Sequence, residues 1–340
     1  MIDKLKIRNE YQELKKIFKT IESLYRNINS LEPGVYLISG KVAVMYRYRR
    51  HYKTLLYTRG KGMKILVPVF SKKSGISNVL NNALCRANSK SIILFNNIHK
   101  SVRRIENEPV YNKKYIELRN KLQEYLYQPK FYVSDDEKQI LEKWYYGKTL
   151  ENIPIRKRIR EVEKIINDLL YMNEKEKNNN ITGYLSKNDL CEYKAYFKRI
   201  GICINEAYTF INRFSLVPSH GDLVTRHVII NDGKYVLIDW DAELVSMRPG
   251  WYDIMSPFEN DEELKKAWII GEFDNQIEKT IEIAGVGNKE SIRMIMPLAW
   301  SISFCRHRPS PSDEVRRRTI KNNLNEWYRI IKDNSHQGFQ

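Results

Sequence analysis

The chain has 340 residues, of which 42% are hydrophobic, and it carries a formal net charge of +17. This length allows a sizeable core in one large domain or in two lobes that share a cleft. Cys85, Cys191, Cys203 and Cys305 have neither the pairing of a disulfide framework nor the spacing of a zinc site. No stretch approaches the roughly 18 apolar residues of a membrane span, and the first residues lack the apolar run of a secretion signal. We therefore expect a cytoplasmic protein.

The positive charge favours association with polyanions such as nucleic acid, an anionic membrane surface, or a phosphorylated or acidic substrate. A composition rich in Lys, Asn and Ile, typical of an AT-biased genome, explains the same charge without any such partner. Charge alone therefore selects no function. We expect no nucleic-acid partner, and peripheral contact with an anionic membrane surface and the oligomeric state stay open.

Residues 1–32 are predicted to form a helical extension. Tyr11, Leu14, Phe18, Ile21 and Tyr25 recur at steps of three and four residues, which places them on one face of a helix.

Residues 33–146 are predicted to form a small, mainly β N-terminal lobe. Short β-rich runs begin at Val35, Lys41, Thr54 and Met63, a short helix is expected around residues 78–84, and further strands cover 91–95 and 99–105. A helix over 111–126 and a strand pair beginning at 131 complete this lobe.

Residues 147–340 are predicted to form a larger, mainly α C-terminal lobe. Helical periodicity covers 156–170 and 187–213 and resumes from Asp261 to the end of the chain. The predicted fold class is therefore α+β with two lobes.

The most informative stretch is 219–241, which reads SHGDLVTRHVIINDGKYVLIDWD. Two strand-like runs flank Asp232-Gly233, a strong signal for a tight hairpin. Asp222 and Asp239 come from the two ends of that hairpin, so their carboxylates can face one site. Phosphoryl transfer needs one group that accepts the proton of the attacking hydroxyl and others that hold magnesium against nucleotide phosphates. Asp222 and Asp239 suit these two roles.

The stretch resembles the aminoglycoside phosphotransferase and choline-kinase-like family, which has a protein-kinase-like fold and motifs of the form HGD-x4-N and ID. The resemblance implies ATP and Mg²⁺ as cofactors, Asp222 as the catalytic residue and Asp239 as a metal ligand. The asparagine position is His227 here, as in macrolide phosphotransferases, so His227 becomes a second metal ligand. It further implies that His220 orders the catalytic loop and that Asp253 ties this loop down.

The same resemblance assigns nucleotide-binding residues in the small lobe. Arg104, with Lys100 as an alternative, stands where the family has a strand lysine that reaches the phosphates, and Glu117 on the next helix is its expected partner. The segment after the strand pair resembles the family's hinge, so backbone groups near Lys143 and Trp144 are expected to meet adenine.

Three functions compete at this point. The first is an ATP-dependent kinase that moves the γ-phosphate to a hydroxyl of a small molecule, namely a sugar, an amino alcohol or a glycan. The second is a pseudokinase or nucleotide-binding module without transfer activity, which the histidine at 227 also allows. The third is a polyanion-binding protein on a kinase-like scaffold.

Overall fold

The computed structural model describes residues 11–12, 14–22, 34–39, 42–45, 65–69, 82–87, 91–96, 100–177, 184–306 and 312–334. The chain forms two compact units. One comprises Met1–Asn112 with Pro129–Tyr145 and is mainly β, and the other comprises Lys113–Gln128 with Tyr146–Gln340 and is mainly α. The α+β organisation with two lobes is therefore confirmed.

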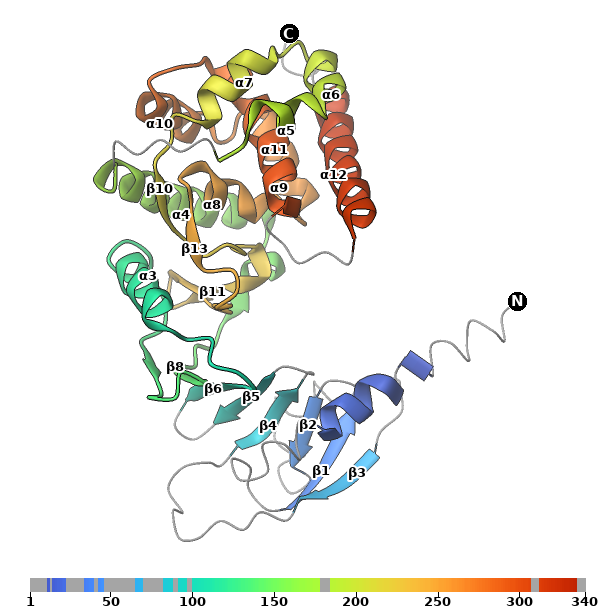
Figure 1. Ribbon diagram of the computed structural model, residues 1–340. Helices are drawn as coiled ribbons and strands as arrows, with labels where there is room; N and C mark the ends of the chain where they lie inside the picture. Colours follow the sequence, from blue (N-terminus) through green and yellow to red (C-terminus); the bar gives the residue numbers. More distant parts are fainter. Residues whose placement is uncertain are drawn as a thin grey trace. The chain divides into compact units, whose positions relative to one another are not determined.

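The β unit contains one eight-stranded sheet in the order β3-β1-β2-β4-β5-β6-β8-β7 (Figure 1). Every neighbouring pair in it is antiparallel. The strands are β1 (Gly34–Ser39), β2 (Val42–Met45), β3 (Ile65–Val69), β4 (Asn82–Ala87), β5 (Ser91–Asn96), β6 (Ser101–Glu106), β7 (Phe131–Val133) and β8 (Gln139–Lys143).

The predicted extension is helical at residues 11–12 and 14–22, but its buried face differs from the expected one. Ile17 and Thr20 are buried, whereas Tyr11 and Phe18 are both 61% exposed. Three- and four-residue steps fit more than one face of a helix, and the contacts of the folded chain select among them.

The short helix expected around residues 78–84 is wrong where the structure describes it. Asn82–Ala87 is strand β4, which pairs with β2 on one side and β5 on the other. Leu84 lies opposite Val44 and Phe95 in the two ladders. Pairing on both edges overrides the weak helical pattern of this segment. The strand expected from Thr54 lies outside the described residues.

The helix that follows the sheet, α3 (Lys113–Gln123), groups with the helical unit and not with the small lobe in which we expected it. Leu118 and Leu122 are buried, and the Arg119 guanidinium lies 4.7 Å above the ring of Trp240, which belongs to the hairpin region. This packing explains why the unit includes residues 113–128.

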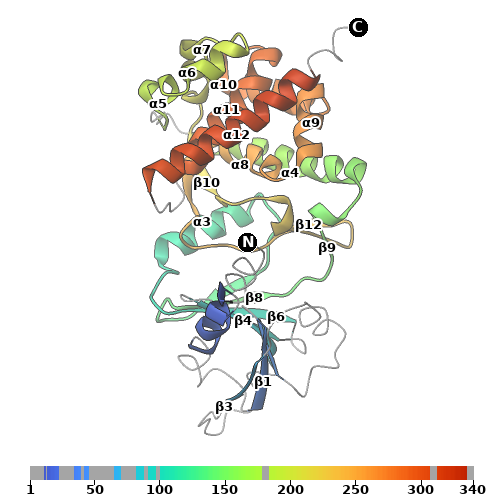
Figure 2. The same ribbon diagram turned by 90° about the vertical axis from the view of Figure 1, so that its right-hand side faces the viewer.

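The longest helices of the helical unit include α4 (Ile155–Lys175), whose Val162, Ile165, Ile166 and Leu169 are fully buried. Figure 2 shows α12 lying across α11, in agreement with their close packing. The other helices are α5 (Lys187–Cys191), α6 (Lys194–Arg199), α7 (Ile204–Ile211), α8 (Trp251–Met255), α9 (Glu262–Ile270), α10 (Asp274–Ala284), α11 (Lys289–Arg306) and α12 (Asp313–Asn334). None of the helices in the described part of the chain is long and apolar enough to cross a membrane.

Two small sheets complete this unit and carry the residues of the motif. One has the order β12-β11-β9, with β9 (Lys148–Thr149), β11 (Val228–Asn231) and β12 (Lys234–Leu237). The other pairs β10 (Leu216–Ser219) with β13 (Ser246–Pro249). Three 3-10 helices, η3 (Leu150–Asn152), η4 (Thr225–His227) and η5 (Ser256–Phe258), lie between the larger elements.

Candidate active site

The predicted hairpin is present as β11 and β12. Asn231 pairs with Lys234, and the two residues between them, Asp232 and Gly233, have φ angles of 48° and 78°. Positive φ at both central residues is the conformation of a tight hairpin turn, which favours the Asp-Gly sequence found here. The hairpin therefore brings the chain from Asp222 back to Asp239.

His220 contacts the chain on both sides of this hairpin. Its Nε2 lies 3.1 Å from the carbonyl oxygen of Ile238, and its Nδ1 accepts the backbone N–H of Asp222 at 3.3 Å. A carbonyl oxygen only accepts, so Nε2 carries the hydrogen. Burial, together with the neighbouring His227, lowers the pKa of His220 to about 3. The neutral ring therefore links the Asp222 loop to the segment that leads to Asp239 through two hydrogen bonds. This agrees with the structural role expected for His220.

Asp253 on α8 holds the loop before Asp222. Its Oδ2 accepts the backbone N–H of His220 at 2.7 Å, and its Oδ1 accepts that of Gly221 at 3.2 Å. Burial raises the pKa of Asp253, while the Arg248 guanidinium and the two N–H donors act in the opposite direction. These contacts give Asp253 the supporting role that the resemblance implied.

Asp222 and His227 are held together across five residues. Nδ1 of His227 lies 2.8 Å from the carbonyl oxygen of Asp222 and 3.5 Å from its Oδ2. Both residues are nearly buried, at 9% and 8% exposure. A carbonyl oxygen only accepts, so Nδ1 of His227 carries a hydrogen.

Asp239 approaches the other ring nitrogen of His227. Nε2 of His227 lies 3.2 Å from Oδ2 of Asp239, and Nε of Arg226 donates to the same Nε2 at 3.2 Å. Asp239 has a φ of 62°, which is uncommon for a residue other than glycine. Such backbone strain often occurs at functional sites. The side chain of Asp239 is 44% exposed, so its carboxylate can be reached from solvent.

The donor set fits a divalent cation that also takes oxygen atoms from a nucleotide. Two neighbouring ligands of an octahedral ion with ligand distances near 2.1 Å lie about 3 Å apart, close to the separation of Nε2 and Oδ2. No group of three His, Cys, Asp or Glu side chains in the described residues is arranged to hold a metal alone. Magnesium in nucleotide sites commonly takes one or two protein ligands and completes its shell with phosphates and water.

Asp241, which follows in the same segment, accepts hydrogen bonds from the turn after it. Its Oδ1 accepts the backbone N–H of Glu243 at 2.9 Å, and its carbonyl oxygen accepts those of Leu244 and Val245. Asp241 thus closes the turn that leads to β13.

The β unit carries the predicted nucleotide-binding residues except Glu117. Arg104 lies on β6 between Ile93 of β5 and Ile140 of β8, and Lys100 is exposed at the turn before β6, with a φ of 50°. Glu117 lies on α3 of the helical unit, where its carboxylate is 3.7 Å from Nζ of Lys113. The pairing of Arg104 with Glu117 stays a prediction.

The predicted hinge has its backbone donors engaged within the β unit. The N–H of Lys143 donates to the Lys130 carbonyl at 3.3 Å, and that of Trp144 donates to the Lys100 carbonyl at 2.6 Å. The Trp144 ring packs on Phe95 at 5.4 Å between centroids. A hinge contact to adenine through these two residues, which stays a prediction, would therefore use carbonyl oxygens.

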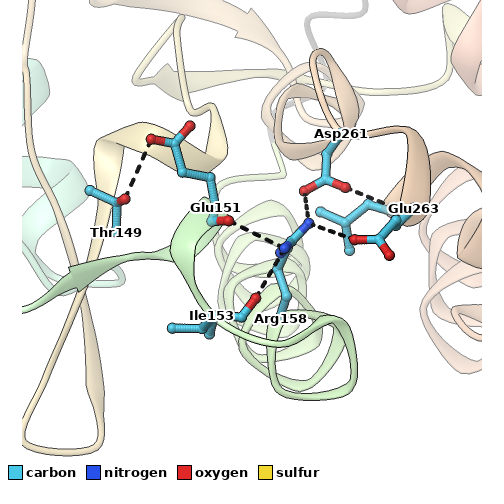
Figure 3. Close-up of polar contacts among 7 residues, drawn as sticks. Thr149, Glu151, Ile153, Arg158, Asp261 and Glu263 are labelled. Atoms are coloured by element: carbon cyan, nitrogen blue, oxygen red, sulfur yellow. Dashed lines mark hydrogen bonds and ion pairs between the residues drawn. The ribbon is translucent and has the colours of Figure 1, made fainter.

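Sequence reasoning missed an ion pair that supports the motif. Arg158 of α4 donates through Nη1 to Oδ2 of Asp261 at 2.6 Å and through Nη2 to the carbonyl oxygens of Glu151 and Ile153 (Figure 3). The segment it holds, η3, packs against η4, which carries His227. Arg156 and Arg160 lie close to Arg158 at the start of α4, so nothing in the sequence singles out Arg158.

Comparison with known proteins gives structural similarity only. No protein-family model and no curated protein sequence matches the chain. A choline kinase from Streptococcus pneumoniae is 13% identical, with a TM-score of 0.39, over 75% of this chain and 92% of that one. An aminoglycoside phosphotransferase from Alicyclobacillus acidocaldarius is 11% identical, with a TM-score of 0.42, over 80% and 97%. An ethanolamine kinase from Plasmodium vivax is 16% identical, with a TM-score of 0.40, over 70% and 79%.

Proposed function

We propose that this protein is an ATP-dependent phosphotransferase whose acceptor is a hydroxyl group of a small molecule. The observation that carries the proposal is the contact of His227 with both Asp222 and Asp239, at 3.5 Å and 3.2 Å, from opposite ends of one hairpin. Asp222 and Asp239 are the residue types that the sequence motif requires, and His227 stands between them at the position where the motif has asparagine.

Asp222 is the residue proposed to act on the acceptor. Its main chain is fixed by His220 and His227, and its carboxylate is largely enclosed, so it can hold a hydroxyl in one orientation. As the γ-phosphoryl group passes to the acceptor oxygen, the bond from phosphorus to the ADP oxygen breaks and the hydroxyl proton moves to the Asp222 carboxylate. Positioning and charge stabilisation, more than covalent chemistry, account for catalysis in such transfers.

Asp239 and His227 are proposed to hold Mg²⁺ through Oδ2 and Nε2. When bound, this ion neutralises charge on the phosphates of the nucleotide. The chain supplies its part by fixing the two donors: the N–H of Ile238 donates to the carbonyl oxygen of His227 at 2.8 Å, which ties the Asp239 segment to η4. Arg104, Lys100, Glu117, Lys143 and Trp144 stay proposed nucleotide contacts.

The acceptor is proposed to be a sugar, an amino alcohol or a glycan. The protein is proposed to act in the cytoplasm. Cys191 and Cys203 are exposed free thiols, which accords with a reducing compartment.

The experiment is a transfer assay with γ-labelled ATP, magnesium and a panel of these three acceptor classes. Wild type is expected to label at least one class of acceptor. Asp239→Asn is expected to transfer phosphate at least about 10²-fold more slowly than wild type. Asn tolerates the positive φ of residue 239, so this variant should fold. Asp232→Asn makes the same change at the exposed hairpin turn and should keep full activity. Full activity in Asp239→Asn would refute the mechanism, and nucleotide binding without transfer in wild type would favour a pseudokinase.

A further inference from the structure

Arg248 on β13 is a buried cation that lies against the catalytic loop. It is 4% exposed, its Nε donates to Oγ of Ser246 at 3.0 Å, and its Nη2 donates to the carbonyl oxygen of Leu244 at 3.1 Å. A Cβ at Gly221, the residue before Asp222, would lie 3.1 Å from the same Nη2. Consecutive Cα atoms are about 3.8 Å apart. The guanidinium is therefore within the length of one small molecule of the residue proposed to act on the acceptor.

The third nitrogen of this guanidinium, Nη1, is buried and has no hydrogen-bond partner. Among the described residues no carboxylate forms an ion pair with Arg248, although its charge acts on Asp253. The guanidinium packs over the ring of Tyr252, 4.3 Å from the ring centre. An arginine side chain only donates and keeps its positive charge in proteins, and a buried donor or charge without a partner is costly. Nη1 therefore has N–H groups available for a negatively charged partner from outside the chain.

Further buried donors without a partner lie on α11, which packs against α8, the helix that carries Tyr252. Oγ of Ser303 is fully buried and makes no hydrogen bond, and neither does Nε1 of Trp300, one turn earlier on the same helix. Burial raises the pKa of Tyr184, while Ser303 and Arg248 lower it. Arg248 and Ser303 therefore both lie near the Tyr184 hydroxyl, outside the geometry of a hydrogen bond.

The chemistry of these groups selects an anionic oxygen group as their ligand. Nη1 of Arg248 only donates, and the hydroxyl of Ser303 can donate, so the two match a ligand atom that accepts. Hydrogen bonds from a guanidinium to a carboxylate or a phosphate are among the strongest in proteins. A positively charged ligand would be repelled by the buried guanidinium.

We propose that Arg248 and Ser303 bind an anionic group, a carboxylate or a phosphate, on the acceptor whose hydroxyl Asp222 receives. The inference rests on the proposed phosphotransferase function and narrows its acceptor to a molecule with both a hydroxyl and an anionic group. Tyr184 is half-buried, so this group of side chains reaches the protein surface, and the acceptor enters past Tyr184. The net charge of +17 attracts such anions to the protein.

The test is stabilisation of the full chain by the two simplest anionic probes, acetate and inorganic phosphate, at constant ionic strength. A ligand that binds the folded chain raises its unfolding temperature as its concentration rises, which gives an apparent Kd. Ser303→Ala removes a hydroxyl that bonds nothing in the chain, so it should fold normally. It is expected to raise the apparent Kd of the probe about 10-fold, the factor that one hydrogen bond to a charged group represents.

Ser301→Ala is the matched control for Ser303→Ala. Ser301 is equally buried on α11, but its hydroxyl donates to the carbonyl oxygen of Pro297, so its loss should leave the apparent Kd unchanged. Arg248→Lys is a second variant, which keeps the positive charge but loses the planar guanidinium. It should raise the apparent Kd more than Ser303→Ala does.

Stabilisation mainly by acetate identifies a carboxylate on the acceptor, and stabilisation mainly by phosphate identifies a phosphate, if Ser303→Ala weakens it. An equal apparent Kd in wild type and Ser303→Ala, or no stabilisation of wild type by either probe, overturns the proposal.

Transfer from γ-labelled ATP separates this inference from the proposed function. Sugars and glycans are compared with and without a carboxylate or phosphate group. Preference for the anionic member of a pair, reduced in Ser303→Ala, supports the inference. Transfer that prefers the neutral members overturns the inference and leaves the phosphotransferase standing. Binding of the probes that depends on Ser303, without transfer to any acceptor, refutes the phosphotransferase and leaves only an anion-binding site.

Discussion

The backbone N–H of His220 donates to Oδ2 of Asp253 at 2.7 Å, across 33 residues of sequence. The same His220 side chain bonds the backbone of Asp222 and of Ile238. The catalytic loop is thus fixed to α8 through its main chain and to the hairpin through an imidazole. His220 and Asp253 are both buried. Loss of one of these hydrogen bonds would leave a buried donor or acceptor that water cannot reach, and this costs more stability than loss of an exposed hydrogen bond.

Gly221 is required by both its backbone and its surroundings. It has a φ of 79°, and a Cβ there would lie 2.3 Å from the carbonyl oxygen of Leu244. We expect Gly221→Ala to lower the free energy of unfolding by about 3 kcal/mol or more, since strain and a clash with backbone add. Chemical denaturation measures this loss.

Gly233→Ala is the control for Gly221→Ala. Gly233 has nearly the same φ, 78°, but a Cβ there would meet nothing within 4 Å. Only the conformational cost of about 1 kcal/mol is expected. Equal losses of unfolding free energy in the two variants would show that the close approach of Gly221 to Leu244 does not affect stability.

His220 should make stability depend on pH. Its folded pKa of about 3 lies below the ordinary value of 6.5, so the unfolded chain binds a proton between these values that the folded chain does not. Stability is therefore lost as pH falls below about 6.5, by up to about 1.4 kcal/mol per pH unit from this group. His220→Gln should be less stable near neutral pH and show a flatter decline. Unfolding free energies across this range decide it, and an unchanged slope would contradict the assignment.

His227→Asn should change metal preference. Imidazole suits Mn²⁺ better than Mg²⁺, whereas an amide oxygen suits Mg²⁺. The ratio of transfer rates in Mg²⁺ and Mn²⁺ should move towards Mg²⁺ by about tenfold, a usual effect of altering a metal environment. Asparagine also retains a donor for the Asp222 carbonyl. A ratio that does not move would argue that residue 227 holds no metal.

Arg158→Met should destabilise the helical unit strongly. It leaves the Asp261 side chain, only 6% exposed, without its cation, at a cost of about 3 to 5 kcal/mol. Glu263 also contacts Arg158 but is 61% exposed, so Glu263→Gln should cost no more than about 1 kcal/mol (Figure 3). Thermal unfolding of both variants tests the contrast, and similar losses would rule out the buried pair as the main contact.

The local signals of the motif were sufficient to predict its geometry. Asp232-Gly233 between two apolar runs defines a hairpin because few other residues adopt two successive positive φ angles. That turn placed Asp222 and Asp239 at the two ends of one hairpin. His227, five residues after Asp222, lies in η4, and its side chain contacts Asp222. Strands β5, β6, β7 and β8 were also predicted, since each is a clear β-rich run next to a turn.

Other features depend on partners far along the chain and left no local trace. Asn82–Ala87 became a strand because β2 and β5 both pair with it. α3 joined the helical unit because Arg119 meets Trp240, more than 100 residues away. The contact of Arg226 with His227 depends on the orientation of one ring, which only the folded site determines.

The most direct test of the proposed function is a single turnover of γ-labelled ATP with excess enzyme and magnesium, comparing wild type with Asp222→Asn. We predict that wild type moves the label from ATP to an acceptor or, more slowly, to water, and that Asp222→Asn does so at least about 10² times more slowly while binding ATP equally well. Equal rates of label loss in the two proteins would contradict the role of Asp222 and with it the proposed phosphotransferase.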